Sequence, residues 1–281
     1  MKKSIQLQIL LMRSVLKITS LISVKWCASI AFRIFTTPFR KGSPYKPPIF
    51  EKAEKINLQV NGVNIIGYRW NSTANKKILI AHGFESRSFN FYRYIDILVE
   101  KGFCVYAMDA KAHGNSDGKT IVLPEYIAMF RELEKNYGVF DAYICHSFGG
   151  IAVSLYEEEF NHPSSKLILI APATETATAI KLFCAFFNLS DKVMFAMHNL
   201  IEHRSGKKID HYSIKRIAKK ITNPIYWIHD ADDDITPLSD VNELIINKPY
   251  HIKFHITQGL GHRKIYKDPE TIKKVIDFIE F

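Results

Sequence analysis

From residue 56 onward, short apolar runs alternate with segments in which apolar residues recur every three or four positions. The runs are typical of buried strands, and the wider spacing is typical of amphipathic helices. The expected strands cover residues 56–60, 63–70, 77–81, 103–108, 139–145, 166–171, 225–229 and 252–256. The expected helices cover residues 89–101, 124–137, 149–160, 240–246 and 269–281. Strands that alternate with helices predict an α/β fold, with a mostly parallel sheet covered by helices on both faces.

Three stretches depart from this alternation. Asn61-Gly62 between the first two strands is a strong hairpin signal and predicts an antiparallel edge. Residues 174–223 contain no strand and are too long for an ordinary loop, which predicts a helical lid inserted over the carboxyl edge of the sheet. Residues 4–36 lack Gly and Pro and read as helix, and the proline-rich residues 38–48 read as a linker. We therefore expect an N-terminal segment over residues 1–46 and a main domain over residues 47–281.

Charge is distributed unevenly along the chain. Of its 281 residues, 47% are hydrophobic and 23% are charged, which excludes a disordered chain or a coiled coil. Residues 1–46 hold nine Lys and Arg residues and no acid, whereas the rest of the chain is almost neutral, so the net charge of +10 lies in the N-terminal segment. This argues against a nucleic-acid partner for the main domain and points to an anionic membrane surface. The four cysteines have no paired spacing, which favours reduced thiols and excludes a disulfide scaffold or a zinc cluster.

The N-terminal segment admits three interpretations. Its longest uncharged runs are shorter than ten residues, whereas a spanning helix needs about 18. A basic helix could lie on the inner leaflet of a membrane, or the helix could dock on the main domain. The third interpretation is a helix that spans the membrane, or a targeting peptide. The first interpretation, a basic helix on the inner leaflet, predicts a cytoplasmic protein that is peripheral on the inner membrane face.

One pentapeptide carries the strongest chemical signal. Cys145-His146-Ser147-Phe148-Gly149 follows an expected strand and precedes an expected helix, as a nucleophile elbow of the pattern Gly-x-Ser-x-Gly does. Cys145 replaces the first glycine of that pattern. A sharp turn with small neighbours would leave the Ser147 hydroxyl exposed at the start of a helix, where negative charge is favoured.

A nucleophilic serine needs a base, and the base needs an orienting carboxylate. His262 follows the last strand in a glycine-rich loop, and residues 229–237 offer four carboxylates after the penultimate strand. The chain order serine, aspartate, histidine is that of the α/β-hydrolases. His82 and His146 are expected to support loops and to take no part in proton transfer.

From about residue 56 to the C-terminus, the chain resembles the α/β-hydrolase superfamily, and most nearly its branch of monoacylglycerol lipases, lysophospholipases and serine aminopeptidase-type hydrolases. The motifs that carry the resemblance are residues 82–85, 109–118, 145–149, 229–237 and 261–262. It implies an α/β-hydrolase fold with a small helical lid. It also implies that Asp233 is the acid, with Asp232 and Asp234 as alternatives, and that the backbone N–H groups of Phe84 and Phe148 form the oxyanion hole.

These residues predict a lipase-like serine hydrolase that cleaves a small-molecule carboxylic ester through an acyl-enzyme, with a lipid ester or a thioester among the candidate substrates. Ser147 is the expected nucleophile, His262 the base and then the acid, and Asp233 the group that orients His262. No cofactor and no metal are implied. The alternatives are an acyltransferase or a C–C hydrolase on the same fold, or a non-catalytic membrane-associated binding protein. The retained Ser147, Asp233 and His262 speak against the last of these.

Overall fold

The computed structural model describes residues 3–40 and 45–280, so part of the expected linker, residues 41–44, lies outside the described residues. The chain forms two compact units. Unit 1 comprises Met1–Thr37 and Glu175–Ser213, and unit 2 comprises Pro38–Thr174 and Ile214–Phe281. The chain therefore passes between the two units three times.

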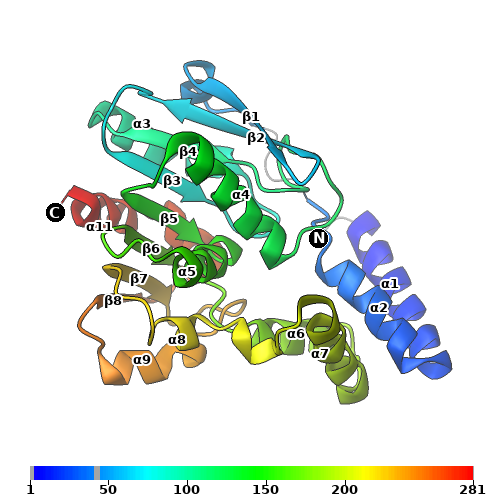
Figure 1. The fold of residues 1–281 in the computed structure, drawn as a ribbon. Coiled ribbons are helices and arrows are strands. Elements are labelled where there is room, and N and C mark those ends of the chain that lie inside the picture. Colours follow the sequence, from blue (N-terminus) through cyan, green and yellow to red (C-terminus); the bar gives the residue numbers. More distant parts are fainter. Residues whose placement is uncertain (1–2, 41–44, 281) are drawn as a thin grey trace. The chain divides into compact units, whose positions relative to one another are not determined.

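Unit 2 is built on one eight-stranded sheet (Figure 1), with the strand order β1-β2-β4-β3-β5-β6-β7-β8. The strands are β1 Glu54–Val60, β2 Val63–Trp70, β3 Lys77–Ala81, β4 Cys104–Met108, β5 Ala142–His146, β6 Lys166–Ile170, β7 Ile225–Asp230 and β8 Ile252–Thr257. Strand β2 pairs antiparallel with β1 and β4, and the remaining neighbours pair in parallel. The expected hairpin and the mostly parallel sheet are confirmed.

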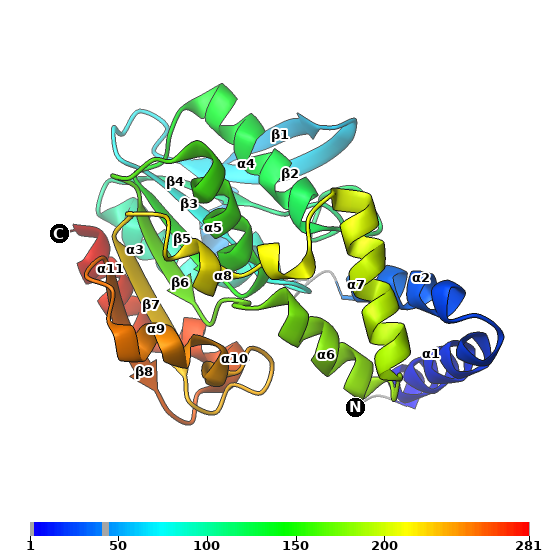
Figure 2. The same cartoon turned by 60° about the horizontal axis from the view of Figure 1, so that its bottom comes forward.

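Helices cover both faces of this sheet (Figure 2). One face carries α4 Leu123–Tyr137, α5 Phe148–Phe160 and the short α8 Ile214–Ile217, and the other carries α3 Tyr92–Glu100 and α11 Pro269–Glu280. The remaining helices of unit 2 are α9 Asn242–Asn247, α10 Gly261–Lys264 and the 3₁₀ turns η1 Pro48–Glu51, η2 Ser88–Phe91, η4 Leu238–Val241 and η5 Ile265–Lys267. The α/β-hydrolase fold expected from the sequence is therefore the observed fold.

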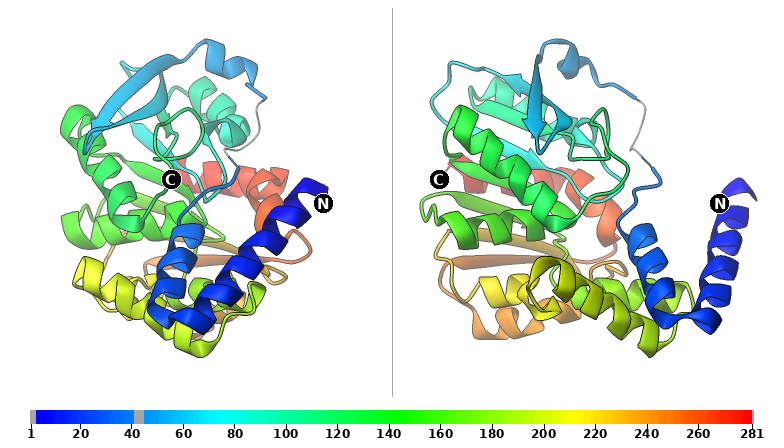
Figure 3. Two further views of the ribbon diagram at one scale, coloured as in Figure 1. Left: turned by 90° about the vertical axis from the view of Figure 1, so that its right-hand side faces the viewer. Right: turned by 45° about the vertical axis from the view of Figure 1, so that its right-hand side comes forward.

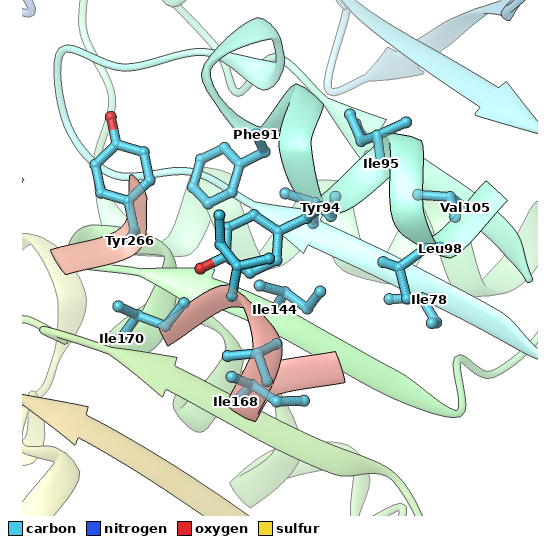
Figure 4. Close-up of a cluster of buried hydrophobic side chains, with 14 of the residues drawn as sticks. Ile78, Phe91, Tyr94, Ile95, Leu98, Val105, Ile144, Ile168, Ile170 and Tyr266 are labelled. Atoms are coloured by element: carbon cyan, nitrogen blue, oxygen red, sulfur yellow. The ribbon is translucent and has the colours of Figure 1, made fainter. Parts of the chain in front are cut away.

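The core beneath α3 and α11 shows why the alternating pattern folds this way (Figure 4). Ile78, Ile144 and Ile168 come from three adjacent parallel strands, and Tyr94 and Leu98 point down onto them from α3. All five side chains are almost completely buried. Apolar strands that are buried on both faces are what a parallel sheet requires, and they fix the ends of β5 and β7, where Ser147 and Asp233 follow.

Unit 1 is mainly helical among its described residues, and Glu175 and Ser213 form an isolated antiparallel β-bridge. It contains α1 Lys3–Ile22, α2 Val24–Phe35, α6 Thr176–Phe186, α7 Asp191–Ser205 and the turn η3 Ile209–His211. Helices α1 and α2 diverge from a turn at Ser23, whose side chain accepts a hydrogen bond from the N–H of Trp26 (Figure 3). The expected insertion over residues 174–223 thus corresponds to α6, α7 and η3, while α8 belongs to unit 2.

The first two helices pack on α6 and α7 within unit 1. The ring of Phe35 meets that of Phe183 edge-on with centroids 5.4 Å apart, and the Arg204 guanidinium lies 5.1 Å from the centre of the Phe32 ring. The Arg13 guanidinium donates to the carbonyl of Phe186 at 2.6 Å. Among the described residues, no helix combines the length and apolarity that crossing a membrane would demand.

Candidate active site

The turn between β5 and α5 holds Ser147 in a rare backbone conformation. Its φ is 51° and its ψ is −117°, a region that residues other than glycine seldom adopt. The neighbours must be small for the turn to fit. A Cβ on Gly149 would lie 2.3 Å from the carbonyl oxygen of Ala81, and one on Gly150 would lie 2.7 Å from Pro172 Cβ. Strain of this kind persists where surrounding structure enforces it, and it commonly marks a functional site.

Cys145 occupies the position at which the elbow pattern has its first glycine. Its side chain is completely buried and free, and burial raises the pKa of the Cys145 thiol well above its ordinary value. A neutral buried thiol packs as a small apolar group. The departure from the pattern is therefore accommodated, and it adds no second nucleophile.

Ser147, His262 and Asp233 come together from three separate strand ends. The Ser147 hydroxyl donates to His262 Nε2 at 3.0 Å, and His262 Nδ1–H donates to Asp233 Oδ2 at 2.8 Å. This assignment places the ring proton on Nδ1, facing the carboxylate, and a lone pair on Nε2, facing the hydroxyl. All three side chains are buried or nearly so. The geometry is that of a nucleophile, a base and an orienting acid.

Both carboxylate oxygens of Asp233 accept hydrogen bonds. Its Oδ1 accepts the N–H groups of Ile235 and Thr236 at 2.9 and 2.8 Å, and its Oδ2 also accepts the Thr236 hydroxyl at 2.9 Å. Burial alone would raise the pKa of Asp233, but the hydrogen bond and charge of His262 and the two backbone N–H groups outweigh it, so the pKa is lowered. Asp233 is therefore held ionised beside His262.

The two alternative acids, Asp232 and Asp234, do not pair with His262. Asp232 Oδ2 accepts the N–H of Gly259 at 3.0 Å, and Asp234 is exposed. His262 pairs with Asp233, and within the described part of the chain it forms no hydrogen bond or ion pair with either alternative. Of the three candidates, the structure brings Asp233 to the histidine.

Asp230 has a structural role that the sequence did not reveal. Its Oδ1 accepts the N–H of Asp232, and its Oδ2 accepts the Thr257 hydroxyl at 2.7 Å and the N–H of Leu260 at 3.1 Å. Burial opposes ionisation, yet these donors lower the pKa of Asp230. Its carboxylate thus ties the loop that carries Asp233 to the loop that carries His262.

His146 supports His262 from the elbow itself. Its Nε2–H donates to the backbone carbonyl of His262 at 3.0 Å, and the two rings lie 4.7 Å apart. Burial and the neighbouring His262 lower the pKa of His146 well below its ordinary value. A neutral ring that is committed to a backbone carbonyl positions the base and is unsuited to proton transfer, as the sequence suggested.

His82 organises the loop that follows β3. Its Nδ1–H donates to the carbonyl of Gly83 at 2.8 Å, and its Nε2 accepts the N–H of Ala110 at 2.9 Å. Burial lowers the pKa of His82 to about 4, so the ring is neutral at pH 7. The next turn of this loop is held by His113, whose Nε2 accepts the N–H of Glu85 at 3.0 Å.

Phe84 and Phe148 belong to two segments that meet at the serine. A Cβ on Gly83 would lie 2.9 Å from Ser147 Cβ, so glycine allows the loop of Phe84 to approach the serine closely. Phe148 is the first residue of α5, so its N–H points out of the helix with no intrahelical acceptor. The two rings meet edge-on with centroids 6.0 Å apart. The two residues expected to supply the oxyanion donors therefore lie in segments that meet at Ser147.

Within residues 3–40 and 45–280, no three His, Cys, Asp or Glu side chains are grouped in a way that could hold a metal ion.

Comparison with known proteins agrees with this fold. A family model described as serine aminopeptidase S33 matches residues 72–216, just over half of the chain. The chain belongs to this family. The S33 model covers β3 to α8, including the elbow and the helices α6 and α7. Membership makes the chain an α/β-hydrolase and confirms the resemblance found in the sequence.

Individual relatives of this S33 family member are distant. A monoacylglycerol lipase of Mycolicibacterium smegmatis is 27% identical over 269 residues, covering 80% of this chain and 95% of the relative. An uncharacterised Bacillus subtilis protein is 23% identical over 244 residues, covering 81% and 79%. A Pyrococcus furiosus esterase structure has a TM-score of 0.66 at 18% identity, covering 87% of this chain and 97% of that one. At this identity the structural likeness supports the fold alone.

Proposed function

We propose that this S33 family member is a serine hydrolase that cleaves a carboxylic ester through an acyl-enzyme. The observation that carries the proposal is the unbroken path from Asp233 through His262 to Ser147, at 2.8 and 3.0 Å, on a serine with positive φ. The monoacylglycerol lipase among the relatives supports ester chemistry.

In the proposed reaction, Ser147 Oγ attacks the carbonyl carbon of the ester while His262 Nε2 takes the hydroxyl proton. His262 then gives this proton to the departing alkoxide, which leaves as the alcohol. Water repeats the sequence on the acyl-enzyme and releases the acid. In both halves, Asp233 stabilises the charged ring of His262 and keeps Nε2 aimed at the reacting oxygen.

Each tetrahedral intermediate carries a negative oxygen that needs fixed donors. The N–H groups of Phe84 and Phe148 fill this role in the proposal. The N-terminus of α5 adds favourable potential, because the peptide dipoles of a helix leave positive charge at that end. Buried donors of this kind are worth several kcal/mol to the transition state, about 3–4 for one removed donor in a comparable site.

A lipid ester or a thioester is the finer substrate proposal. The same acyl-enzyme could pass its acyl group to an acceptor other than water, and a C–C hydrolase would use the same three residues. A purely binding role has less support, because a strained serine costs about 1–3 kcal/mol and a protein without catalysis gains nothing from it.

Labelling with a fluorophosphonate probe tests the proposal directly, since the probe traps an activated serine. We expect the chain to be labelled and the Ser147→Ala variant to be blank, with exposed Ser239→Ala as the matched control. A panel of p-nitrophenyl, glycerol and thioesters of rising acyl length then defines the substrate. Wild-type protein that is folded and neither labelled nor active on any ester would refute the proposal.

We also propose that residues 1–46 hold the protein at an anionic membrane surface, on the inner face of the cytoplasmic membrane. The nine basic residues without an acid in this segment support the proposal, because each basic side chain near such a surface contributes about 1 kcal/mol.

A further inference from the structure

Helix α1 presents an apolar face to solvent. The exposed apolar side chains follow one another at steps of one, three or four residues, so they line one side of the helix. The most exposed are Leu21 at 82% and Ile22 at 68%. The full stripe consists of Leu7, Leu10, Leu11, Val15, Ile18, Leu21 and Ile22. Contiguous exposed apolar surface of this kind is uncommon on a protein that has no partner there.

The opposite side of α1 already faces the interior of unit 1. Leu16 and Thr19 are buried, and the carbonyl of Leu16 accepts a hydrogen bond from the Cys27 thiol of α2 at 3.3 Å. The apolar stripe is therefore separate from the side of α1 that packs into the core of unit 1. It is a second apolar side on a helix whose first side is packed.

Helices α1 and α2 also carry exposed positive charge. Lys17, Lys25 and Arg33 are exposed on α1 and α2, and the first acid of the chain is Glu51. Trp26 also stands half exposed, shortly after the end of α1. Exposed apolar and indole side chains together with basic ones are the side-chain set that binds at the headgroup level of an anionic membrane.

We propose that the outer face of α1 lies in the plane of an anionic lipid surface, with its apolar stripe inserted below the headgroups. This inference rests on the membrane attachment proposed above and identifies the face that makes it. With 20 residues, α1 extends for about 30 Å along the surface. Because the other side of α1 is packed on protein, the helix binds parallel to the membrane as part of folded unit 1.

Charge decides between a lipid surface and a second copy of the chain. Stripe-to-stripe pairing of two copies would bring the two basic α1 helices together, and residues 1–50 supply no carboxylate to neutralise them. An anionic surface supplies the negative charge that such a pair lacks. The lipid surface is therefore the complementary partner.

The test uses the full chain, with vesicles of phosphatidylcholine alone or mixed with phosphatidylglycerol. The triple substitution Leu11→Gln, Ile18→Gln, Leu21→Gln should lower partitioning onto anionic vesicles at least about tenfold, since it removes inserted apolar surface. The matched control is Ile246→Gln with Tyr250→Gln, which alters equally exposed apolar residues of unit 2 and should bind as the wild type does.

A charge variant separates the two contributions to binding. Lys17→Gln, Lys25→Gln, Arg33→Gln should lower binding to anionic vesicles by at least about tenfold while leaving the weaker binding to neutral vesicles unchanged. High salt should mimic this variant and weaken the attachment only in part.

Tryptophan fluorescence can report whether the region around Trp26 inserts into the lipid. The other two tryptophans, Trp70 and Trp227, are buried, so an emission shift to shorter wavelength on vesicle addition would report Trp26. Brominated lipid should quench it, and Trp26→Phe should abolish the change.

Two results would overturn the proposal. The first is a glutamine triple variant that binds as tightly as the wild type. The second is a wild type that is dimeric in light scattering, becomes monomeric with the same substitutions and binds no vesicles, which would assign the stripe to a second copy. Fluorophosphonate labelling in detergent should persist in every variant, so failure here is distinguishable from failure of the proposed hydrolase activity.

Discussion

Replacing Asp233 with Asn tests the site most sharply, because the geometry dictates which way the new amide must face. Asp233 Oδ1 receives two backbone N–H groups, from Ile235 and Thr236. An amide NH₂ at the Oδ1 position would face these two donors, so the amide oxygen of the substituted side chain must occupy that position instead. The NH₂ then occupies the Oδ2 position and points a donor at His262 Nδ1.

This orientation reverses the tautomer of His262. To accept from the new amide, Nδ1 must give up its proton, and the neutral ring then carries the proton on Nε2. That atom faces the Ser147 hydroxyl at 3.0 Å and would present an N–H where the reaction needs a lone pair. The ring keeps its place but loses its function as a base.

We expect a fall in kcat of about 10⁴-fold, as for the same substitution in a comparable triad. At 1.36 kcal/mol per factor of ten, this raises the barrier by about 5.4 kcal/mol. Loss of the charge-assisted bonds should lower the free energy of unfolding by about 1–3 kcal/mol, which leaves a folded protein to assay. Steady-state hydrolysis of a short p-nitrophenyl ester measures the first effect, and urea unfolding measures the second.

The imidazole nitrogens supply an independent readout. In ¹⁵N NMR at neutral pH, the wild-type ring should carry its proton on Nδ1 and the variant ring should carry it on Nε2. Exposed Asp234→Asn is the matched control and should change neither activity nor tautomer. If Asp233→Asn retained activity within tenfold, or left the tautomer unchanged, the assigned role of Asp233 would be wrong.

Four further outcomes follow from the same structure. Ser147→Ala should lower ester hydrolysis by about 10⁶-fold with the fold intact by circular dichroism; substantial residual turnover would place the nucleophile elsewhere. Gly149→Ala should cost about 1–3 kcal/mol of stability in urea unfolding, because its Cβ would lie 2.3 Å from the Ala81 carbonyl oxygen; a neutral effect would contradict the tight elbow. Burial lowers the pKa of His82 from 6.5 to about 4, so the unfolded chain binds more protons between these values and stability falls as pH drops. From pH 6.5 to pH 5 this one group accounts for about 1.6 kcal/mol, and equal stability at both pH values would count against a neutral His82. Asp230→Asn puts an amide donor against a backbone N–H of one catalytic loop and should lower kcat by about 10–100-fold through misplacement of His262; an unchanged kcat would remove Asp230 from the positioning network.

The fold and the elbow were predictable because their signals are local. Apolar runs of five to eight residues mark the strands, and small residues around Ser147 mark the only kind of turn that fits between β5 and α5. The observed helix boundaries differ from the expected ones where a 3₁₀ turn precedes the helix. The expected helix over residues 89–101 begins with the 3₁₀ turn Ser88–Phe91, and the helix proper covers Tyr92–Glu100.

The network around His262 was less predictable because it depends on contacts between distant loops. Asp230 and Leu260 are thirty residues apart, and a carboxylate in an acidic loop gives no sign of which backbone N–H it will meet. Thr236 is a further example. Its hydroxyl lies 2.9 Å from Asp233 Oδ2 and 3.1 Å from His262 Nδ1, yet a threonine before a proline looks like an ordinary turn residue.

The N-terminal helices show where periodicity alone is ambiguous. The sequence posed docking on protein and attachment to a membrane as alternatives, because a helix that is apolar nearly all round fits either environment. Unit 1 separates the two sides of α1, with Leu16 packed inward and Leu21 exposed. One helix can therefore contribute to a folded unit and still offer lipid an apolar face. A shortened chain that begins near Tyr45 would lack the helices on which α6 and α7 pack, so substitutions on the outer face test membrane attachment more cleanly than truncation.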